Sequence, residues 1–216
     1  MLSKDYILGF VEGEGCFSVG IGRYIDRRPK VRSKPSNIKN PYLFQVKPMF
    51  VITNVETNKQ LLEEIRENIG VGKVYFTKRD QSLSQQNVAQ YRVQALGDCL
   101  KVKDYFAGIE FRTEKGKDYL NWCKCLELIA KGTHLTKEGL LELCGLRDQM
   151  NFRKTKNKWT TEEIRKILDE KPLHQTGFFD AAQQSLIHNS SEGKTDLKEW
   201  LSSKQGNNKP SRATSP

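Results

Sequence analysis

Hydrophobic patterning assigns this 216-residue chain to the α+β class, with one antiparallel β-sheet covered by helices. The hydrophobic period switches between the helical value and the two-residue value of strands, and glycine or polar turns separate the segments. The resulting order is one helix, two strands, one helix, two strands and then further helices. Because this order occurs once, we expect a single domain with a helical extension and a tail.

The first predicted helix runs from Lys4 to about Gly13. Ser3 precedes it and is a favoured N-cap residue. Four apolar side chains then recur at helical spacing, namely Tyr6, Ile7, Phe10 and Val11. Glycines at positions 13 and 15 end the helix, because glycine readily leaves the helical backbone conformation.

Two strands are expected after this helix. The first spans Cys16 to Tyr24, where apolar residues alternate with small ones. Its apolar members are Phe17, Val19 and Ile21. Residues 25–43 are rich in lysine, arginine and proline, which indicates a basic loop, and the second strand spans about Phe44 to Thr53.

The rest of the chain predicts a second pair of strands between helices. A helix is expected from Asn54 to Asn68, with Leu61, Leu62 and Ile65 on its apolar face. Strands follow at 73–79 and 90–96, with a polar turn at 80–87. Further helices are expected at 98–107, 115–131, 136–152 and 160–170. Residues 171–216 are rich in Ser, Asn, Gln and Lys, so we expect most of them to be flexible.

The net charge of +10 favours a polyanionic partner. Lysine and arginine neutralise phosphates and release condensed counterions, so nucleic acid is the expected partner. The alternative is a solvated basic surface without a specific partner. The sequence contains no run of about 18 apolar residues, so we expect no membrane-spanning helix. No targeting signal is recognisable near the N-terminus.

The cysteines and histidines do not indicate a zinc site. The five cysteines are odd in number and match no zinc-binding spacing, and the three histidines form no cluster. We therefore expect reduced structural thiols, as in a reducing compartment.

The segment Ile7-Leu8-Gly9-Phe10-Val11-Glu12-Gly13-Glu14-Gly15 carries the strongest functional signal. Gly9 and Gly13 lie four residues apart on one helical face, where small residues let two helices approach closely. If two copies pack through this face, their C-terminal ends bring two Glu14 carboxylates together. A divalent cation between these carboxylates relieves their repulsion and stays accessible to a substrate.

These nine residues resemble the signature of the LAGLIDADG homing endonuclease family, with glutamates at both acidic positions. The segments Phe50–Asn54 and Ile69–Gly72 resemble the middle of single-motif members, and the resemblance covers about residues 3–130. It implies a four-stranded, saddle-shaped sheet backed by helices in each subunit of a homodimer. The expected divisions are an endonuclease core at 1–131, a helical extension at 132–170 that contacts the DNA backbone, and a polar tail at 171–216.

The resemblance also implies an activity. Such an enzyme makes site-specific double-strand breaks in a long, near-palindromic DNA target by Mg²⁺-dependent phosphodiester hydrolysis. Glu14 and Gly13 are the expected metal-site residues. The helix that meets its partner would contribute Ile7, Gly9, Phe10, Glu12 and Gly13. Within this helix Glu12 is expected to cap or buttress rather than to bind metal.

Three further residues receive catalytic roles from the resemblance. Asn54 falls where the family places a polar residue that positions the attacking water, although a helix N-cap would explain it equally well. Lys115, or in second place Lys117, would stabilise the pentavalent phosphate. The family often has two adjacent lysines after a threonine, whereas here Glu114 takes the first of those positions.

Alternating polar residues on the predicted strands suit base-edge reading in the major groove. An ordinary solvent-facing sheet would give the same pattern. With the basic loop and a flanking basic segment, the expected DNA-binding residues are Ser18, Gly20, Tyr24, Arg27, Arg28, Lys30, Arg32, Lys34, Gln45, Lys47, Met49, Lys73, Tyr75, Thr77, Arg79, Gln90, Arg92, Gln94, Lys154, Lys156 and Lys158.

Two other functions remain open at this point. An RNA maturase on the same fold would bind its host intron RNA, although acidic residues at both motif positions favour a nuclease. A non-catalytic DNA-binding regulator would use the helices at 136–170. Members of this family are usually intron-encoded, which implies a chloroplast or mitochondrion if the gene is organellar and a prokaryotic cytoplasm otherwise.

Overall fold

The computed structural model describes residues 2–23, 44–79, 86–151 and 159–170. A four-stranded antiparallel sheet in the order β1-β2-β4-β3 forms its centre. The strands are β1 (Gly15–Arg23), β2 (Phe44–Val55), β3 (Lys73–Thr77) and β4 (Val88–Val93). The helices are α1 (Lys4–Glu14), α2 (Lys59–Ile69), α3 (Leu96–Tyr105), α4 (Lys115–Ala130), α5 (Lys137–Asp148) and α6 (Thr161–Glu170).

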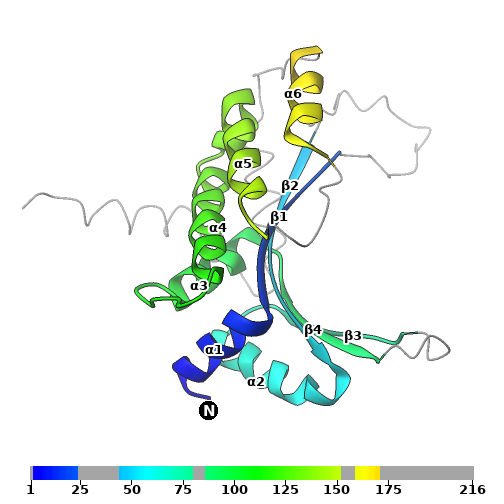
Figure 1. Ribbon diagram of the computed structural model, residues 1–216, viewed down its shortest axis with the longest axis vertical. Helices are drawn as coiled ribbons and strands as arrows, with labels where there is room; N and C mark the ends of the chain where they lie inside the picture. The colour runs from blue at the N-terminus through cyan, green and yellow to red at the C-terminus, as the bar shows by residue number, and fades with distance from the viewer. Residues whose placement is uncertain (1, 24–43, 80–85, 152–158, 171–216) are drawn as a thin grey trace, which may run out of the picture.

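The sheet curves through the molecule and has two unlike faces (Figure 1). Helices α3, α4 and α5 lie along its convex face, and α1 and α2 lie at one end of it. None of the described helices covers the opposite, concave face. The α+β class and the four antiparallel strands predicted from the sequence are therefore confirmed.

Helix α1 forms as the sequence predicts and extends one residue beyond Gly13. The Ser3 hydroxyl accepts the Tyr6 backbone N–H at 3.1 Å, which caps the helix. The helix ends at Gly15 because the chain approaches itself closely there. A Cβ atom at position 15 would lie 2.5 Å from the Val11 carbonyl oxygen, so a larger residue would force the helix and β1 apart.

The predicted start of the second helix is wrong. Asn54 and Val55 remain in β2, paired with Ala89 and Val88 of β4, and a 3-10 turn at Glu56–Asn58 precedes α2. Ladder pairing to β4 supplies hydrogen bonds that a helix beginning at residue 54 would lose. The other end matches the prediction, because Gly70 adopts a φ of 81° and ends α2.

Smaller boundary shifts occur elsewhere. Strand β3 ends two residues before the predicted Arg79, and β4 begins two residues before the predicted Gln90. Helix α3 begins at Leu96 instead of residue 98, because Leu96 is buried and joins the core. Helix α5 ends at Asp148 rather than at 152, and Asn151 takes a φ of 52° that no helix continues through.

An aromatic cluster joins the sheet to α3 and α4. Phe17 of β1 stacks on Phe50 of β2 with 4.9 Å between ring centroids, and it lies 5.2 Å from Trp122 of α4. Phe17, Phe50 and Trp122 are fully buried, and burial of such side chains is the dominant stabilising contribution to a fold of this kind. The same hydrophobic cluster includes Leu143 of α5 and Ile164 of α6, so helices after residue 131 pack on the sheet's core.

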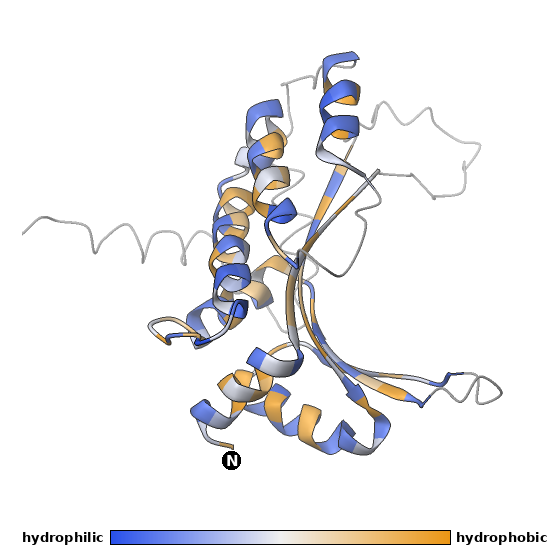
Figure 2. Cartoon of the chain, viewed as in Figure 1, coloured by the Kyte–Doolittle hydropathy of each residue, from blue (hydrophilic) through white to orange (hydrophobic). Residues whose placement is uncertain are grey.

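Amphipathic patterning is visible on the peripheral helices. In Figure 2, α2 and α6 each carry hydrophobic and hydrophilic residues on different sides. Ile164 and Leu168 form the buried side of α6. On the charged side of the same junction, Arg147 of α5 donates to Asp148 and to Thr161, which joins the two helices.

All five cysteines are free thiols, as expected. Four are buried in the core and only Cys16 is partly exposed. Burial raises the pKa of Cys123 to about 11 and that of Cys125 to about 12, which keeps both thiols protonated. Among the described helices none is long and apolar enough to cross a membrane.

Candidate functional site

The signature helix α1 has one side buried in its own subunit and one side open. Ile7 and Val11 are fully buried against the sheet. On the open side, a Cβ atom added at Gly9 or Gly13 would meet no atom within 4 Å among the described residues, apart from the backbone of α1 itself. Ile7 is among the residues expected to meet a partner helix, and the structure corrects this expectation, because its side chain packs inward.

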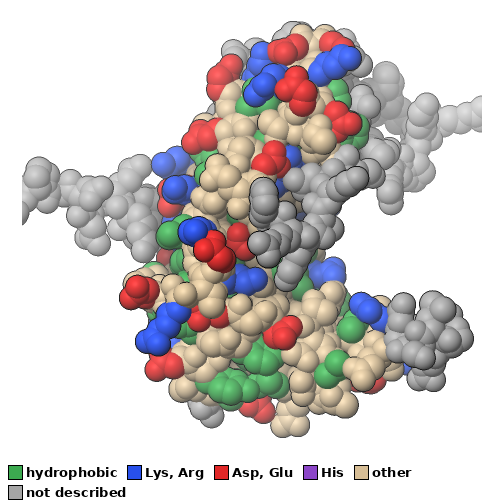
Figure 3. Space-filling model, viewed as in Figure 1, with side chains coloured by type: hydrophobic (Ala, Val, Ile, Leu, Met, Phe, Trp, Pro, Cys, Tyr) green, Lys and Arg blue, Asp and Glu red, His purple; other side chains and the backbone are tan. Residues whose placement is uncertain are grey.

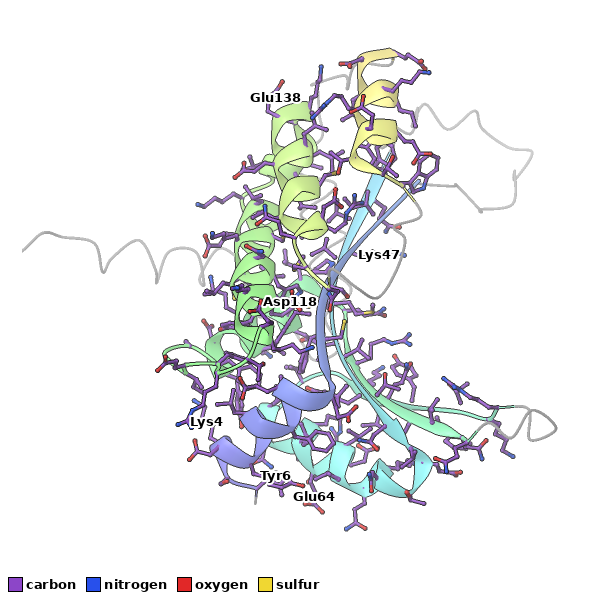
Figure 4. The ribbon with its side chains drawn as sticks, viewed as in Figure 1. Lys4, Tyr6, Lys47, Glu64, Asp118 and Glu138 are labelled. Carbon is purple, nitrogen blue, oxygen red and sulfur yellow. The ribbon has the colours of Figure 1, made fainter. Side chains whose placement is uncertain are left out.

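Aromatic residues extend the open side of α1. Tyr6 is 49% exposed and stacks on Phe10 with 6.4 Å between ring centroids. Figure 3 shows hydrophobic side chains gathered at the end of the molecule where α1 and α2 lie, and Figure 4 labels Tyr6 at that end. An exposed apolar group beside two accessible glycines is typical of a helix that packs against another helix.

Glu14 is the last residue of α1 and is exposed. Its carboxylate has no hydrogen-bond or ion-pair partner among the described residues. No group of three or more metal-ligating side chains occurs in that part of the chain either. The end of α1 therefore offers a single uncommitted carboxylate, which is fewer oxygen ligands than a divalent cation requires.

Glu12 occupies a different environment from Glu14. Its Oε1 accepts the backbone N–H of Arg112 at 2.5 Å and that of Thr113 at 2.9 Å. These two residues belong to the segment that leads into α4. The contact therefore fixes the end of α1 to the start of α4 across about 100 positions of sequence, which agrees with the expected buttressing role.

The two candidate lysines begin α4 just beyond this contact. Lys117 donates from Nζ to Glu114 at 3.0 Å, and both side chains are largely exposed. Lys115 is partly buried, and its side chain forms no ion pair with any described residue. Its backbone N–H donates to the Thr113 hydroxyl at 3.3 Å. The Lys115 ammonium is therefore the freer of the two to meet a phosphate.

Asn54 lies on β2 with its amide engaged locally. Its Oδ1 accepts the Val55 N–H at 2.8 Å and the Asn58 Nδ2 at 2.9 Å. Asn58, and not Asn54, occupies the N-cap position of α2, so the N-cap alternative is wrong. Asn54 also shares strand parity with the buried residues Phe50 and Ile52, which places it on the side opposite the concave face.

The concave face carries the polar residues predicted from alternation. Phe44 and Val46 are buried, while the intervening Gln45 and the following Lys47 are exposed, as the burial of β2 shows. Figure 4 labels Lys47 beside β2, away from α4 and α5. Residues of this face in the described part of the chain are Ser18, Gly20, Gln45, Lys47, Met49, Lys73, Tyr75, Thr77, Gln90, Arg92 and Gln94. Arg79 lies just beyond β3 and is exposed.

In Figure 3 this side of the molecule is hollowed, and lysine and arginine side chains lie along its edge. The remaining predicted DNA contacts fall outside the described residues. They are Tyr24, Arg27, Arg28, Lys30, Arg32, Lys34, Lys154, Lys156 and Lys158. The joint between the helices that a DNA-binding regulator would use, at 152–157, also falls outside them.

Two residues of the site were missed by the sequence analysis. Thr53 lies on the concave face and accepts from Gln90 Nε2 at 3.0 Å; continuing the alternation beyond Met49 would have found it. Asn151 donates from Nδ2 to the Phe17 carbonyl at 2.7 Å, and its N–H donates to Asp118 at 3.1 Å. Nothing in the sequence near Asn151 signals this long-range contact with β1.

The sheet has an open concave face and is backed by helices (Figure 1). At one end of it lies α1, which has glycines on its open side and glutamates at its C-terminal end. This is the architecture of the homing endonuclease class. The family model for the LAGLIDADG endonuclease matches residues 7–126. This chain belongs to the LAGLIDADG endonuclease family.

Curated relatives support this membership. The chain is 29% identical over 138 residues to a Podospora anserina protein described as an uncharacterized 50.9 kDa protein in ND4 intron 1. It is 28% identical over 140 residues to a probable intron-encoded endonuclease of Neurospora crassa. These matches cover 63% and 64% of this chain but 26% and 22% of the relatives, so the chain spans about a quarter of their length.

Solved structures share the fold. The crystal structure of the homing endonuclease I-TnaI superposes with a TM-score of 0.59 at 28% identity, covering 78% of this chain and 97% of that one. The archaeal intron-encoded homing endonuclease I-Vdi141I, complexed with DNA, superposes with a TM-score of 0.62 at 24% identity, covering 77% and 94%. The four-stranded sheet with helices on one face is therefore the fold of this family.

Proposed function

We propose that this protein is a homing endonuclease that makes site-specific double-strand breaks in DNA. The observation that carries the proposal is Glu14, an exposed carboxylate without a partner among the described residues, at the end of a helix whose open side holds Gly9 and Gly13. Such a carboxylate beside a concave, polar sheet suits phosphodiester hydrolysis on a duplex held against the sheet.

The active form is proposed to be a homodimer joined through α1. No described residue outside the backbone of α1 lies within 4 Å of a Cβ at Gly9 or Gly13, which leaves room for a second helix backbone. A twofold axis beside these glycines would bring the Glu14 carboxylates of both copies together. The same axis would repeat the concave face and create a long site, which suits a nearly palindromic target.

The two Glu14 carboxylates, with the Gly13 carbonyl nearby, would hold Mg²⁺, a cation that prefers oxygen ligands. When bound, this ion would lower the pKa of a water molecule and offset charge on the leaving oxygen. Lys115 would donate to the pentavalent phosphate, with Lys117 as the second candidate. Glu12 would hold the start of α4 so that Lys115 faces the phosphate. To order the attacking water, Asn54 would leave its bonds to Val55 and Asn58 and turn from its side of β2 toward the bound DNA.

Substrate binding would use the concave face and the excess of lysine and arginine over acidic residues. Exposed lysines such as Lys47 and Lys73 would neutralise phosphates, and amides such as Gln45 and Gln94 would reach base edges. The basic loop at 25–43 and the lysines of 152–158 would extend this contact along the duplex. By analogy with the intron-encoded relatives, the gene is proposed to lie in an intron, in an organelle or a prokaryote.

The test combines DNA selection with cleavage. The full chain is incubated with Mg²⁺ and a plasmid library that carries randomised sites, and linearised plasmids are sequenced. The proposal predicts one long, near-palindromic cleaved motif. No cleavage of any plasmid, combined with specific binding to intron RNA in a parallel filter assay, would identify a maturase instead.

A further inference from the structure

One arginine on the concave face is held in place by residues from three strands. Arg92 lies on β4, and its guanidinium carbon is 5.2 Å from the centroid of the Tyr75 ring on β3. Its Nη2 donates to Gln90 Oε1 at 2.7 Å. Gln90 in turn donates from Nε2 to the Thr53 hydroxyl of β2 at 3.0 Å. A cation–π contact and a hydrogen bond together restrict the position of the guanidinium.

Burial limits which atoms of this guanidinium can meet a ligand. Arg92 Nε is buried and has no hydrogen-bond partner among the described residues. A buried donor without an acceptor is unfavourable, so stability alone does not explain this arrangement. One N–H of Nη2 is taken by Gln90, which leaves the other N–H of Nη2 and both of Nη1 to meet an incoming group.

The neighbouring basic residues differ from Arg92 because no ion pair with a described residue restrains their exposed side chains. Lys73 lies directly opposite Arg92 in the β3–β4 register and is exposed. Lys47 on β2 is also exposed, and neither lysine forms an ion pair with a described residue. A mobile ammonium suits a phosphate, whereas a fixed planar fork suits an acceptor pair of defined geometry.

We propose that Arg92 recognises one guanine in each half of the DNA target, through the O6 and N7 atoms in the major groove. This inference rests on the proposed function, which places DNA on the concave face. Guanine is the base that presents two adjacent acceptors in that groove, and the arginine fork matches both. Tyr75, Gln90 and Thr53 act as positioning residues that hold the fork before DNA arrives.

The position of Arg92 in the sheet favours a base over a phosphate. Strand β4 lies between β2 and β3 in the order β1-β2-β4-β3, so it is an interior strand. When a concave sheet follows the major groove, interior strands lie over the base edges, where a side chain held close to the sheet meets bases and only a long mobile lysine extends to a phosphate. A preorganised side chain also loses little rotational freedom on binding, which sharpens discrimination between bases.

The experiment compares selected binding sites among matched variants of the full chain. The wild type, Arg92→Ala and Arg92→Lys are each used, in EDTA, to select duplexes from a randomised DNA library. In the alignment of selected sites, each base position forms a column. We expect one guanine column per half-site of the wild-type motif to vanish in both variants, while the other columns stay. Discrimination at that column should fall by about 5- to 100-fold. Rescue of the column by lysine would show that a fixed planar fork is not required and would overturn the proposal.

A chemical substitution then tests the contact itself. Replacing that guanine with 7-deazaguanine removes the N7 acceptor, so wild-type affinity should fall while Arg92→Ala affinity stays unchanged. Tyr75→Phe keeps the ring under the guanidinium and should keep the guanine column, whereas Tyr75→Ala should weaken it. Equal losses for wild type and Arg92→Ala on the modified duplex would overturn the proposal.

Controls separate this inference from the proposed function. Thermal melting confirms that each variant is folded, and Gln60→Ala, at an exposed residue of α2 outside the proposed DNA-binding surface, should leave the guanine column intact. A wild-type motif that lacks any column sensitive to Arg92 overturns this inference alone. A wild-type chain that selects no DNA motif overturns the proposed function and this inference together.

Discussion

The two glutamates at the end of α1 are separated by one residue, yet they face different surroundings. Glu12 accepts two backbone N–H groups from Arg112 and Thr113 of its own subunit. Glu14 is exposed and forms no hydrogen bond or ion pair with a described residue. Because a helix turns about 100° per residue, side chains two positions apart point to nearly opposite sides. An acidic pair that looks like one feature in the sequence therefore occupies two different environments.

The helix that carries these glutamates also has two unlike sides. Ile7 and Val11, four residues apart, form its inward side, and both are fully buried. Gly9 and Gly13, also four residues apart, form its open side, where no described atom outside the helix's own backbone lies within 4 Å of an added Cβ. The inward side should determine the stability and geometry of one subunit, the open side should determine dimer formation, and Glu14 at the helix end should determine the chemistry.

The largest effect is expected for Glu14→Gln. Without the negative charge the metal site is lost, so the cleavage rate should fall on the order of 10³-fold while DNA binding changes little. Single-turnover cleavage and electrophoretic mobility shift measure the two quantities. Glu67→Gln on α2 is the matched control and should cleave normally. Near-normal cleavage by Glu14→Gln would remove Glu14 from the chemistry.

The next largest effect is expected for Gly9→Leu. A leucine would fit against the described part of the subunit, where no residue outside the backbone of α1 lies within 4 Å of the added Cβ, but it would separate two packed helices. The dimer dissociation constant should rise on the order of 100-fold, whereas Gly9→Ala should change it far less. Analytical ultracentrifugation measures both. An unchanged association of Gly9→Leu would show that the subunits meet elsewhere.

Val11→Ala should act on stability alone. Its side chain is fully buried, so the truncation should lower the free energy of unfolding by about 1–3 kcal/mol. Urea unfolding at fixed protein concentration measures this change. Cleavage well below the melting temperature should stay close to that of the wild type, and a large loss of kcat there would contradict the division of the helix into two sides.

The smallest effect, and the sharpest comparison with Glu14, comes from Glu12. Both hydrogen bonds reach a single oxygen, so the amide oxygen of Glu12→Gln can accept them, whereas Glu12→Ala cannot. We expect Glu12→Ala to lower kcat about tenfold by releasing the start of α4, and Glu12→Gln to restore most of the rate. Equal, severe losses in both variants would indicate that the charge of Glu12 is itself required.

Local periodicity is sufficient to predict most of the fold. The buried side of β1, with Phe17, Val19 and Ile21, follows from alternation alone, and the signature helix follows from its cap and spacing. The start of α2 could not be predicted, because ladder pairing of Asn54 and Val55 with β4 outweighs the local helix signal. Similarly, the place of Asn151 against β1 depends on a contact 134 positions away.

By itself the sequence determined which residues form helices and strands, which faces are apolar and where the acidic motif lies, because these depend on neighbours within a few positions. Only the tertiary structure decided that Ile7 packs inward, that Glu12 holds the start of α4 and that Arg92 lies over Tyr75. These contacts join residues distant in sequence, and their geometry arises only when the sheet and helices pack together.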